Sequence, residues 1–504
     1  METLFNTWTL KVRDFGKISQ ADIRVTPFMM LVGENNSGKS YILELLWGIF
    51  RNLDSILEEY LEEDESFQNL CTSFEANIKL HLDELNRGDI KVIDIDETMQ
   101  TQMVVILNRL LEKTKDQLVK ETFNHPIKIG SLEIHRTSVL KLYCAVSIGN
   151  ITDSEIIQKP DSEEELEVEV VRKVLSLQLQ TLDTEGKSEV VSSYISRNRS
   201  INTMSVSLLS RVISMLVCYD YSTTNRHKRV LRSMSRRLRR IPNDPIYFPA
   251  SRTGFMHTYK TILGNEHKFL KEYAQHEYIG ETPANYGLRL TAPVQDYLNK
   301  LAAIYVDEEQ QEYYKKELDF LRRQIFRGNV TRDQASNIQF VPEQGEGIPL
   351  HITSSLVAEL APLSIFLESQ FDPQLFIIEE SESHLHVGKQ LELVRLFFRL
   401  INKGKSIWLT THSDSFAQQV NNLLTLSRRP DKDVLFQELG YESTDTLPDV
   451  AYSSCYQFQE VNGKTIVEEI ELGEFGYAIP TFNNVLEKLM IETSKIQAQG
   501  EADE

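Results

Sequence analysis

The segment Gly33-Glu34-Asn35-Asn36-Ser37-Gly38-Lys39-Ser40 matches the pattern GxxxxGK[ST]. It lies between the hydrophobic residues 28–32 and a segment from Tyr41 to about Leu61 in which apolar residues recur at helical spacing. Glycines let such a loop wrap around an anion, while backbone N–H groups and the helix amino terminus point at it. Lys39 can reach the β and γ oxygens of a nucleotide, and the Ser40 hydroxyl can bind Mg²⁺. The spacing therefore predicts a P-loop that binds ATP with Mg²⁺.

A second set of reactive side chains follows two short apolar segments near the end of the chain. Residues 375–378 read LFII and are followed by Glu379 and Glu380. The first carboxylate can hold the metal, and the second can polarise the attacking water. His412 follows the apolar segment SIWLTT at 406–411 and is placed to contact a γ-phosphate; the alternative is a capping or surface histidine.

The elements that must position these side chains alternate between helix and strand in the last third of the chain. The pattern predicts helices at 354–369 and 385–402 and from Ser413 to about Leu426, strands at 375–378 and 406–411, a hairpin at 450–470 around Asn462-Gly463, and a terminal helix at 480–497. Such alternation is typical of a parallel sheet. We expect the acidic tail, GEADE, to be disordered.

The first two thirds read as insertions around the P-loop unit. The patterns predict two strands within 7–32, two polar helices within 74–120, a β-rich stretch at 126–195, a helical region at 203–240, a strand at 245–250, and a helical hairpin at about 265–328. The predicted fold class is therefore α/β, with one P-loop domain built from both chain ends and interrupted by a β-subdomain and a helical insert. The predicted parts are 1–260, an amino-terminal lobe; 261–335, a helical insert and assembly module; and 336–504, a carboxyl-terminal lobe.

Composition limits the classes of protein to which the chain can belong. Its 504 residues carry 54 Lys+Arg and 74 Asp+Glu, a net charge of −20, which argues against a protein that coats nucleic acid with its whole surface. No apolar run approaches the roughly 18 residues of a membrane helix, the amino terminus lacks the apolar region of a signal peptide, and the four cysteines show no CxxC spacing. We expect a cytoplasmic protein without a membrane partner.

The motifs resemble those of a known family, the ABC-type ATPases of the SMC/RecF/OLD superfamily, in the form of the AAA-like ATPases of bacterial antiphage defence systems such as PARIS and Septu. The resemblance covers most of the chain. It rests on LKVRDFGKI before the P-loop, GENNSGKS, YFPASRTGF at 247–255, SSLVAELAPL at 354–363, IIEESESHLH at 377–386 and TTHSD at 410–414.

The resemblance implies a role for each matching residue. ATP would be bound by Gly33, Asn35, Asn36, Ser37, Gly38, Lys39, Ser40 and Tyr41. Mg²⁺ would be held by Ser40 and Glu379; Glu380 would be the catalytic base and His412 the switch histidine. Ser354 and Ser355 would belong to the signature segment, which contacts the γ-phosphate bound by a second subunit, so the working unit would be at least a homodimer. The chain departs from the family in having no LSGGQ, Leu356 where glycine is common, and Ser381 where proline is usual; no Q-loop glutamine can be placed.

Three functions are consistent with this resemblance. The first is an ATPase that senses or regulates and controls a separate effector, such as a nuclease or toxin, in an antiphage complex. The alternative is a RecF- or SMC-like DNA-repair or DNA-binding ATPase. An OLD-type nuclease is disfavoured because only residues 413–504 follow His412, so we expect no intrinsic nuclease domain.

Two features could serve an interaction or be structural. The cluster Arg226–Arg240 holds eight Lys/Arg in fifteen residues and could bind nucleic acid, or it could pair with the acidic runs 58–65 and 161–169. The apolar stripe Tyr313, Leu318, Leu321 and Ile325 could form a dimer surface, or it could pack within the subunit.

Overall fold

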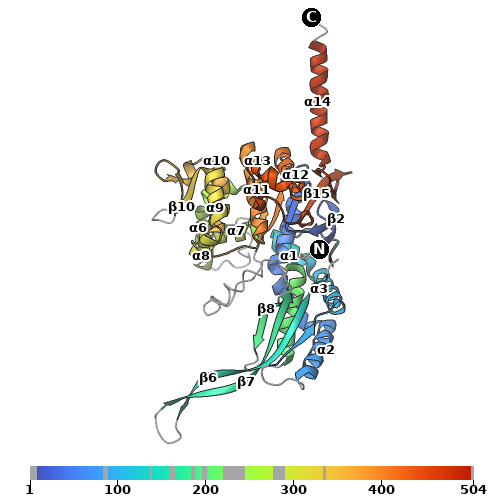
Figure 1. Ribbon diagram of the computed structural model, residues 1–504, viewed down its shortest axis with the longest axis vertical. Helices are drawn as coiled ribbons and strands as arrows, with labels where there is room; N and C mark the ends of the chain where they lie inside the picture. Colours follow the sequence, from blue (N-terminus) through green and yellow to red (C-terminus); the bar gives the residue numbers. More distant parts are fainter. Residues whose placement is uncertain are drawn as a thin grey trace. The chain divides into compact units, whose positions relative to one another are not determined.

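The structure, a computed structural model, describes residues 8–82, 89–136, 139–158, 165–182, 188–195, 201–218, 245–275, 290–332 and 337–500 (Figure 1). The chain divides into two units. The first unit comprises Met1–Trp8, Asn52–Thr114 and Glu133–Arg240, and the second comprises Thr9–Arg51, Lys115–Leu132 and Ile241–Glu504. The cluster Arg226–Arg240 and the last four residues of the acidic tail lie outside the described residues. The three-part division at 260 and 335 stays a prediction.

A nine-stranded mixed sheet organises the second unit, in the order β5-β1-β2-β16-β15-β3-β14-β13-β9. Its strands are β1 Trp8–Phe15, β2 Ile18–Val25, β3 Phe28–Gly33, β5 Ser131–Arg136, β9 Ile246–Phe248, β13 Leu375–Ile378, β14 Ser406–Thr410, β15 Ser453–Val461 and β16 Lys464–Glu469. The five strands β15, β3, β14, β13 and β9 run parallel to one another, whereas β15 is antiparallel to β16. Strands from both chain ends therefore share one sheet, which confirms the predicted α/β fold class.

The strand before the P-loop is shorter than predicted. The sequence predicts two strands within 7–32, but the structure has three, because Thr26-Pro27 separates β2 from β3. Proline has no N–H to donate to a sheet, and the Thr26 hydroxyl donates to the Phe28 carbonyl at 2.7 Å, which makes the turn. β2 alternates in burial, whereas every residue of β3 is buried. β3 is thus a central strand.

Three long helices, α1, α11 and α12, follow the strands β3, β13 and β14 that carry the predicted site, and a fourth, α10, precedes β13. They are α1 Lys39–Tyr60, α10 Ser355–Leu367, α11 Val387–Asn402 and α12 Asp414–Arg428. Side-chain caps fix two of the starts: His386 Nδ1 accepts from Gly388 N at 3.2 Å and Ser413 Oγ accepts from Phe416 N at 3.2 Å. These four helices and the strands between them confirm the predicted alternation.

The predicted helical hairpin at about 265–328 is wrong in detail. The described part holds α6 Arg252–Gln275, α7 Ala292–Ala303, α8 Glu308–Tyr313, α9 Lys315–Phe320 and a π-helical turn, Leu321–Phe326, before the sheet β10 Gly328–Arg332, β11 Ile338–Pro342 and β12 Ile348–Pro349. Leu318 and Leu321 are fully buried and Ile325 is 2% exposed, all within the hydrophobic core of the second unit. The apolar stripe therefore packs within the subunit and is not a dimer surface.

The end of the chain follows the prediction closely. β15 and β16 form the hairpin at Asn462-Gly463, where both residues have positive φ, 54° and 78°, as a tight hairpin turn requires. The remaining elements are α13 Lys432–Leu439, β17 Leu472–Gly473, β18 Gly476–Tyr477, and the terminal helix α14 Pro480–Gly500. Among the described residues no helix is long and apolar enough to cross a membrane.

The first unit contains the predicted β-subdomain. Its four-stranded antiparallel sheet runs β4-β6-β7-β8, with β4 Ile90–Asp94, β6 Leu142–Gln158, β7 Glu165–Leu182 and β8 Ser188–Ile195; its helices are α2 Glu65–Leu82, the first part of α3 Glu97–Phe123, and α4 Ile201–Cys218. β6 and β7 make the long hairpin visible in Figure 1. The sequence analysis missed β4, a five-residue, mostly exposed strand between the two predicted helices.

Candidate nucleotide-binding site

The loop between β3 and α1 has the backbone that wrapping an anion requires. Gly33, Asn36 and Gly38 all have positive φ, 134°, 60° and 94°. A Cβ on Gly33 would lie 2.3 Å from the carbonyl oxygen of Phe458 in β15. Glycine is therefore required at the end of β3 both by backbone conformation and by the close approach of the neighbouring strand.

Lys39 begins α1 and is buried, with 6% of its surface exposed. Its Nζ donates to the carbonyl oxygens of Gly33 at 3.1 Å and Glu34 at 2.6 Å. Burial lowers the pKa of Lys39 to about 8, and this lowering is opposed by nearby carboxylates, first that of Glu380 and then that of Glu382. The ammonium group is thus held at the loop and faces an excess of negative charge.

The other predicted P-loop residues divide into buried and exposed ones. Ser37 is buried, and its hydroxyl donates to the Glu34 carbonyl at 2.7 Å. Asn35, Asn36 and Ser40 are exposed. Tyr41 is 41% exposed, and its ring centroid lies 5.8 Å from that of Phe15 and 5.3 Å from that of Phe123.

The two predicted acids lie directly after β13, at the same edge of the sheet as the P-loop that follows β3. Glu379 is 8% exposed, and its Oε2 accepts from Ala250 N at 3.1 Å. Glu380 has a φ of 41°, and its N–H donates to Thr410 Oγ1 at 2.8 Å, while its Oε2 accepts from Ser383 Oγ at 3.0 Å. The turn after the strand is therefore fixed at backbone and side chain.

His412 follows β14, the strand that lies between the P-loop strand β3 and the acidic strand β13. Its N–H donates to Glu382 Oε1 at 2.5 Å. The pKa of the His412 imidazole is lowered by burial and then by the charge of Lys39, against the opposing charge of Glu380. The structure therefore brings Lys39, Glu379, Glu380 and His412 to one edge of the sheet, where ligands bind in α/β proteins.

Ser354 and Ser355 do not belong to this cluster. Ser354 is the N-cap of α10 and Ser355 its first residue; both are exposed, and the Ser354 hydroxyl makes no capping hydrogen bond. Among the described residues, neither side chain forms a hydrogen bond to the P-loop. Within one subunit the predicted signature segment is thus a free helix end.

A second group of buried side chains lies around Glu379 and was not predicted from the sequence. Burial, followed by the charge of Glu379, raises the pKa of Glu44 to about 8, and burial raises that of Tyr247 above its usual value. Glu44 Oε1 accepts from Thr291 Oγ1 at 3.2 Å and from the Tyr247 hydroxyl at 3.4 Å. Glu44 lies in α1 with nothing in the local sequence to mark it, because its neighbours come from other parts of the chain.

The residues present suit a nucleotide with Mg²⁺. Hydroxyl and carboxylate oxygens, as in Ser40 and Glu379, are the ligands that Mg²⁺ prefers, and it usually takes one or two carboxylates together with phosphate oxygens. Among the described residues no group of three or more His, Cys, Asp and Glu side chains could hold a metal ion by itself. The exposed α1 start and the positive-φ loop offer N–H groups to the phosphates.

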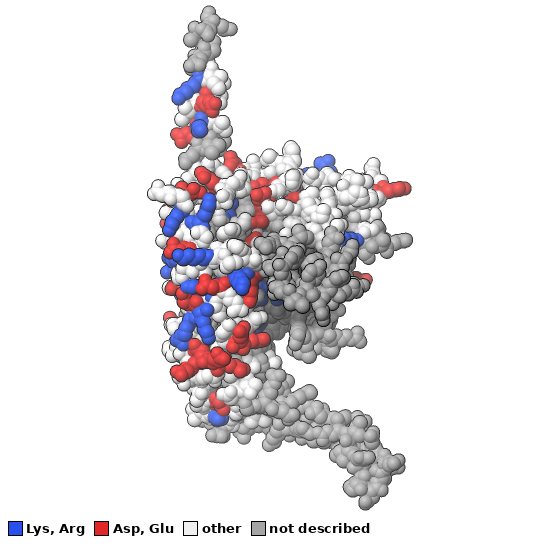
Figure 2. All heavy atoms as spheres, turned by 180° about the vertical axis from the view of Figure 1, so that it is seen from behind, with Lys and Arg blue, Asp and Glu red and all other residues white. Residues whose placement is uncertain are grey.

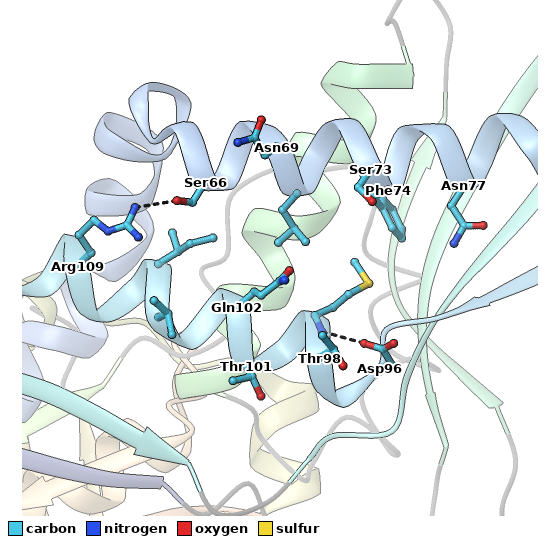
Figure 3. A pocket seen from close by; sticks show the side chains of 14 residues that line it. Ser66, Asn69, Ser73, Phe74, Asn77, Asp96, Thr98, Thr101, Gln102 and Arg109 are labelled. Atoms are coloured by element: carbon cyan, nitrogen blue, oxygen red, sulfur yellow. Dashed lines mark hydrogen bonds between the residues drawn. The ribbon is translucent and has the colours of Figure 1, made fainter.

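Two hollows lie among the described residues, and the second is bordered by Glu34 of the P-loop motif. A cavity of about 660 Å³ lies between α2 and α3 of the first unit, and in Figure 3 amide side chains from both helices, Asn77 and Gln102, point into it. A second hollow of about 420 Å³ lies beside Glu34 and is lined by residues of β15, β16 and the start of α14. The first contains none of the predicted site residues.

Comparisons with known proteins identify a family. The AAA ATPase domain matches residues 9–206 and 260–417. No curated protein matches the chain. Among solved structures, an SMC head domain from Thermotoga maritima is 10% identical, with 93% of this chain and 100% of that chain covered and a TM-score of 0.31. A Pyrococcus furiosus Smc head domain with an extended coiled coil, bound to the C-terminal domain of ScpA, is 12% identical, with 97% and 99% covered and a TM-score of 0.30.

Proposed function

The chain belongs to the AAA ATPase domain family, and on that premise we propose that it is an ABC-type ATPase that binds ATP with Mg²⁺ at the P-loop and hydrolyses it. The observation that carries the proposal is the gathering of Lys39, Glu379, Glu380 and His412 at one edge of the sheet, beside the loop. A phosphate clamp, a metal-binding acid and a base are the parts that phosphoryl transfer to water needs.

Each side chain has one task in this proposal. Lys39 exchanges its contacts with the Gly33 and Glu34 carbonyls for phosphate oxygens, which its charge favours. Ser40 and Glu379 hold Mg²⁺, which neutralises charge on the phosphates when bound. Glu380 accepts a proton from the attacking water, and His412 orients the γ-phosphate. The buried surroundings of Glu379 keep its carboxylate in place.

The hydrolysis proposal is tested with two variants and a control. Lys39→Ala removes the phosphate clamp and should abolish ATP binding, whereas Glu380→Gln should bind ATP and lower turnover by about 10²–10⁴-fold, the usual contribution of a general base. Glu474→Gln changes an exposed acid elsewhere in the second unit and should match wild type. ATP binding by fluorescence and phosphate release are measured; equal turnover in Glu380→Gln and wild type would remove Glu380 as the base.

We propose further that the complete site forms between two subunits. Within one subunit neither Ser354 nor Ser355 forms a hydrogen bond to the P-loop, and the exposed amino end of α10 can bind an anion such as a phosphate through its N–H groups. Light scattering on Glu380→Gln should show a monomer without ATP and a dimer with ATP, and Ser354→Ala/Ser355→Ala should weaken the dimer. A monomer under both conditions contradicts this assembly.

The biological role that we propose is regulation of a separate effector, such as a nuclease or toxin, in a bacterial antiphage complex. Its support is the motif resemblance together with the large inserted unit. Two half-buried cations of the second unit, Arg13 and Arg24, are ion-paired to Asp22 and Glu469, and basic and acidic side chains are interspersed on the face that Figure 2 draws. These residues therefore give no support to nucleic acid as the main partner. Copurification with the product of the neighbouring gene, followed by effector assays with and without ATP, tests the role; absence of a stable complex contradicts it.

A further inference from the structure

A buried arginine lies directly behind the two acids. Arg252 begins α6, one short turn after β9, and only 2% of its surface is exposed. Its guanidinium donates to the backbone carbonyl oxygens of both Glu379 and Glu380, the second at 3.1 Å, and to that of Pro249 at 3.2 Å. One side chain thus holds the backbone of the turn that carries the proposed metal ligand and the proposed base.

The charge of Arg252 is balanced from a different element. Arg252 forms an ion pair with Glu359 of α10, whose side chain is fully buried. The other oxygen of Glu359 accepts from the Thr253 hydroxyl at 2.6 Å. A buried guanidinium is stable only when it is paired and hydrogen-bonded, so the position of Arg252 depends on the position of α10.

The turn that Arg252 holds is strained. Glu380 has a φ of 41°, in the left-handed region that residues with a Cβ adopt at a cost of roughly 1–2 kcal/mol. Such a conformation persists only where the surroundings fix it. Arg252 supplies one of the contacts that do so; further contacts are Thr410 Oγ1 on the Glu380 N–H, Ser383 Oγ on its carboxylate, and the Ser383 N–H on its carbonyl oxygen at 2.9 Å.

We infer that Arg252 is a positioning residue that sets the orientation of Glu380, and that its ion pair with Glu359 couples this turn to helix α10. The inference rests on the proposed function of Glu380. Glu359 lies about one helical turn inside α10 from Ser354 and Ser355, so a shift of α10 moves Glu359 and with it Arg252. Binding of a phosphate or a second subunit at the exposed amino end of α10 would in this way alter the orientation of Glu380, which lies more than 20 residues further along the chain.

The test separates positioning from simple packing. Arg252→Lys keeps a positive charge but cannot reach two carbonyls and a carboxylate at once. The double variant Arg252→Leu/Glu359→Leu removes both charges and fills the space with apolar groups, a replacement that buried ion pairs often tolerate without loss of stability. Glu359→Asp is the conservative comparison.

Two readouts are needed. We expect kcat to fall about 10- to 100-fold in Arg252→Lys and in the double variant while KM for ATP changes less than about threefold, because the phosphate-binding loop is untouched. We also expect amide hydrogen exchange across residues 379–386 to become at least about tenfold faster without nucleotide. In Glu359→Asp, which keeps the carboxylate, both the fall in kcat and the rise in exchange should be smaller than in the double variant. Wild-type kcat and wild-type exchange in a folded double variant would overturn the inference.

The exchange readout keeps this inference separate from the proposed function. If the wild-type chain does not hydrolyse ATP, the proposed function fails, and exchange across 379–386 still decides whether Arg252 holds the turn. If the wild type hydrolyses ATP and the double variant loses only thermal stability, Arg252 has a packing role and the inference fails alone.

Discussion

The ionisation of Lys39 predicts how ATP binding depends on pH. Burial lowers the pKa of Lys39 to about 8 in the nucleotide-free site. A lowered pKa means that the cation is lost as pH rises through 8, and only the cation attracts a phosphate. ATP affinity should therefore fall between pH 7 and pH 9, although an ordinary lysine remains charged over that range.

The size of the effect follows from the charged fraction. With a pKa of about 8, Lys39 is about nine-tenths protonated at pH 7 and about one-tenth protonated at pH 9. Because the apparent Kd is the intrinsic Kd divided by the competent fraction, it should rise about tenfold over this interval. Bound phosphate favours the cation, so ATP binding at pH 9 should also take up close to one proton.

Calorimetry with a non-hydrolysable ATP analogue in two buffers of different ionisation enthalpy measures both quantities. Wild-type protein is used, since Glu380→Gln would itself change the charge around Lys39. Lys39→Arg, which stays protonated, should show a flat pH profile whatever its absolute affinity. Glu44 also has a pKa of about 8, so its ionisation must be distinguished from that of Lys39. Glu44→Gln removes the Glu44 ionisation and should keep the wild-type dependence of ATP affinity on pH. A flat wild-type profile, or a slope lost in Glu44→Gln, would refute the role of Lys39 ionisation.

Two further predictions concern stability, one through packing and one through a buried ion pair. Gly48→Ala places a Cβ 2.1 Å from Thr122 Oγ1 and should lower the free energy of unfolding by about 1–3 kcal/mol; Gly264→Ala, where no atom lies within 4 Å of the added Cβ, should leave it unchanged or raise it slightly. Urea denaturation compares the two, and equal midpoints would contradict the packing argument. Asp445→Asn weakens a fully buried carboxylate's ion pairs to two arginines, at 2.6 and 2.8 Å, and should cost roughly 3–5 kcal/mol. Asp431→Asn, at an exposed pair, should leave Tm unchanged, and a similar loss in both would show that burial is not the cause.

The P-loop and the acidic strand could be predicted because their signals are local. GENNSGKS and LFIIEE combine reactive residues with the apolar strand that must precede them, and the structure places both strands in one sheet, on either side of β14. The catalytic roles assigned to Glu380 and His412 stay predictions, as does the signature role of Ser354 and Ser355. The stripe at Leu318, Leu321 and Ile325 was ambiguous for a physical reason: helical apolar spacing is the same whether the face meets another subunit or its own core.

By itself the sequence determined the reactive residue types, the order of strands and helices around them, and the hairpin at Asn462-Gly463, because each depends on side chains within a few positions of one another. Only the tertiary structure decided which distant residues meet: Glu44 beside Glu379, and Arg252 between Glu359 and the Glu380 turn. An isolated buried charge is prohibitively costly in free energy, yet a chain does not show locally where its partner lies. The lowered pKa of Lys39 and the fixed orientation of the two acids are therefore properties of the folded sheet edge.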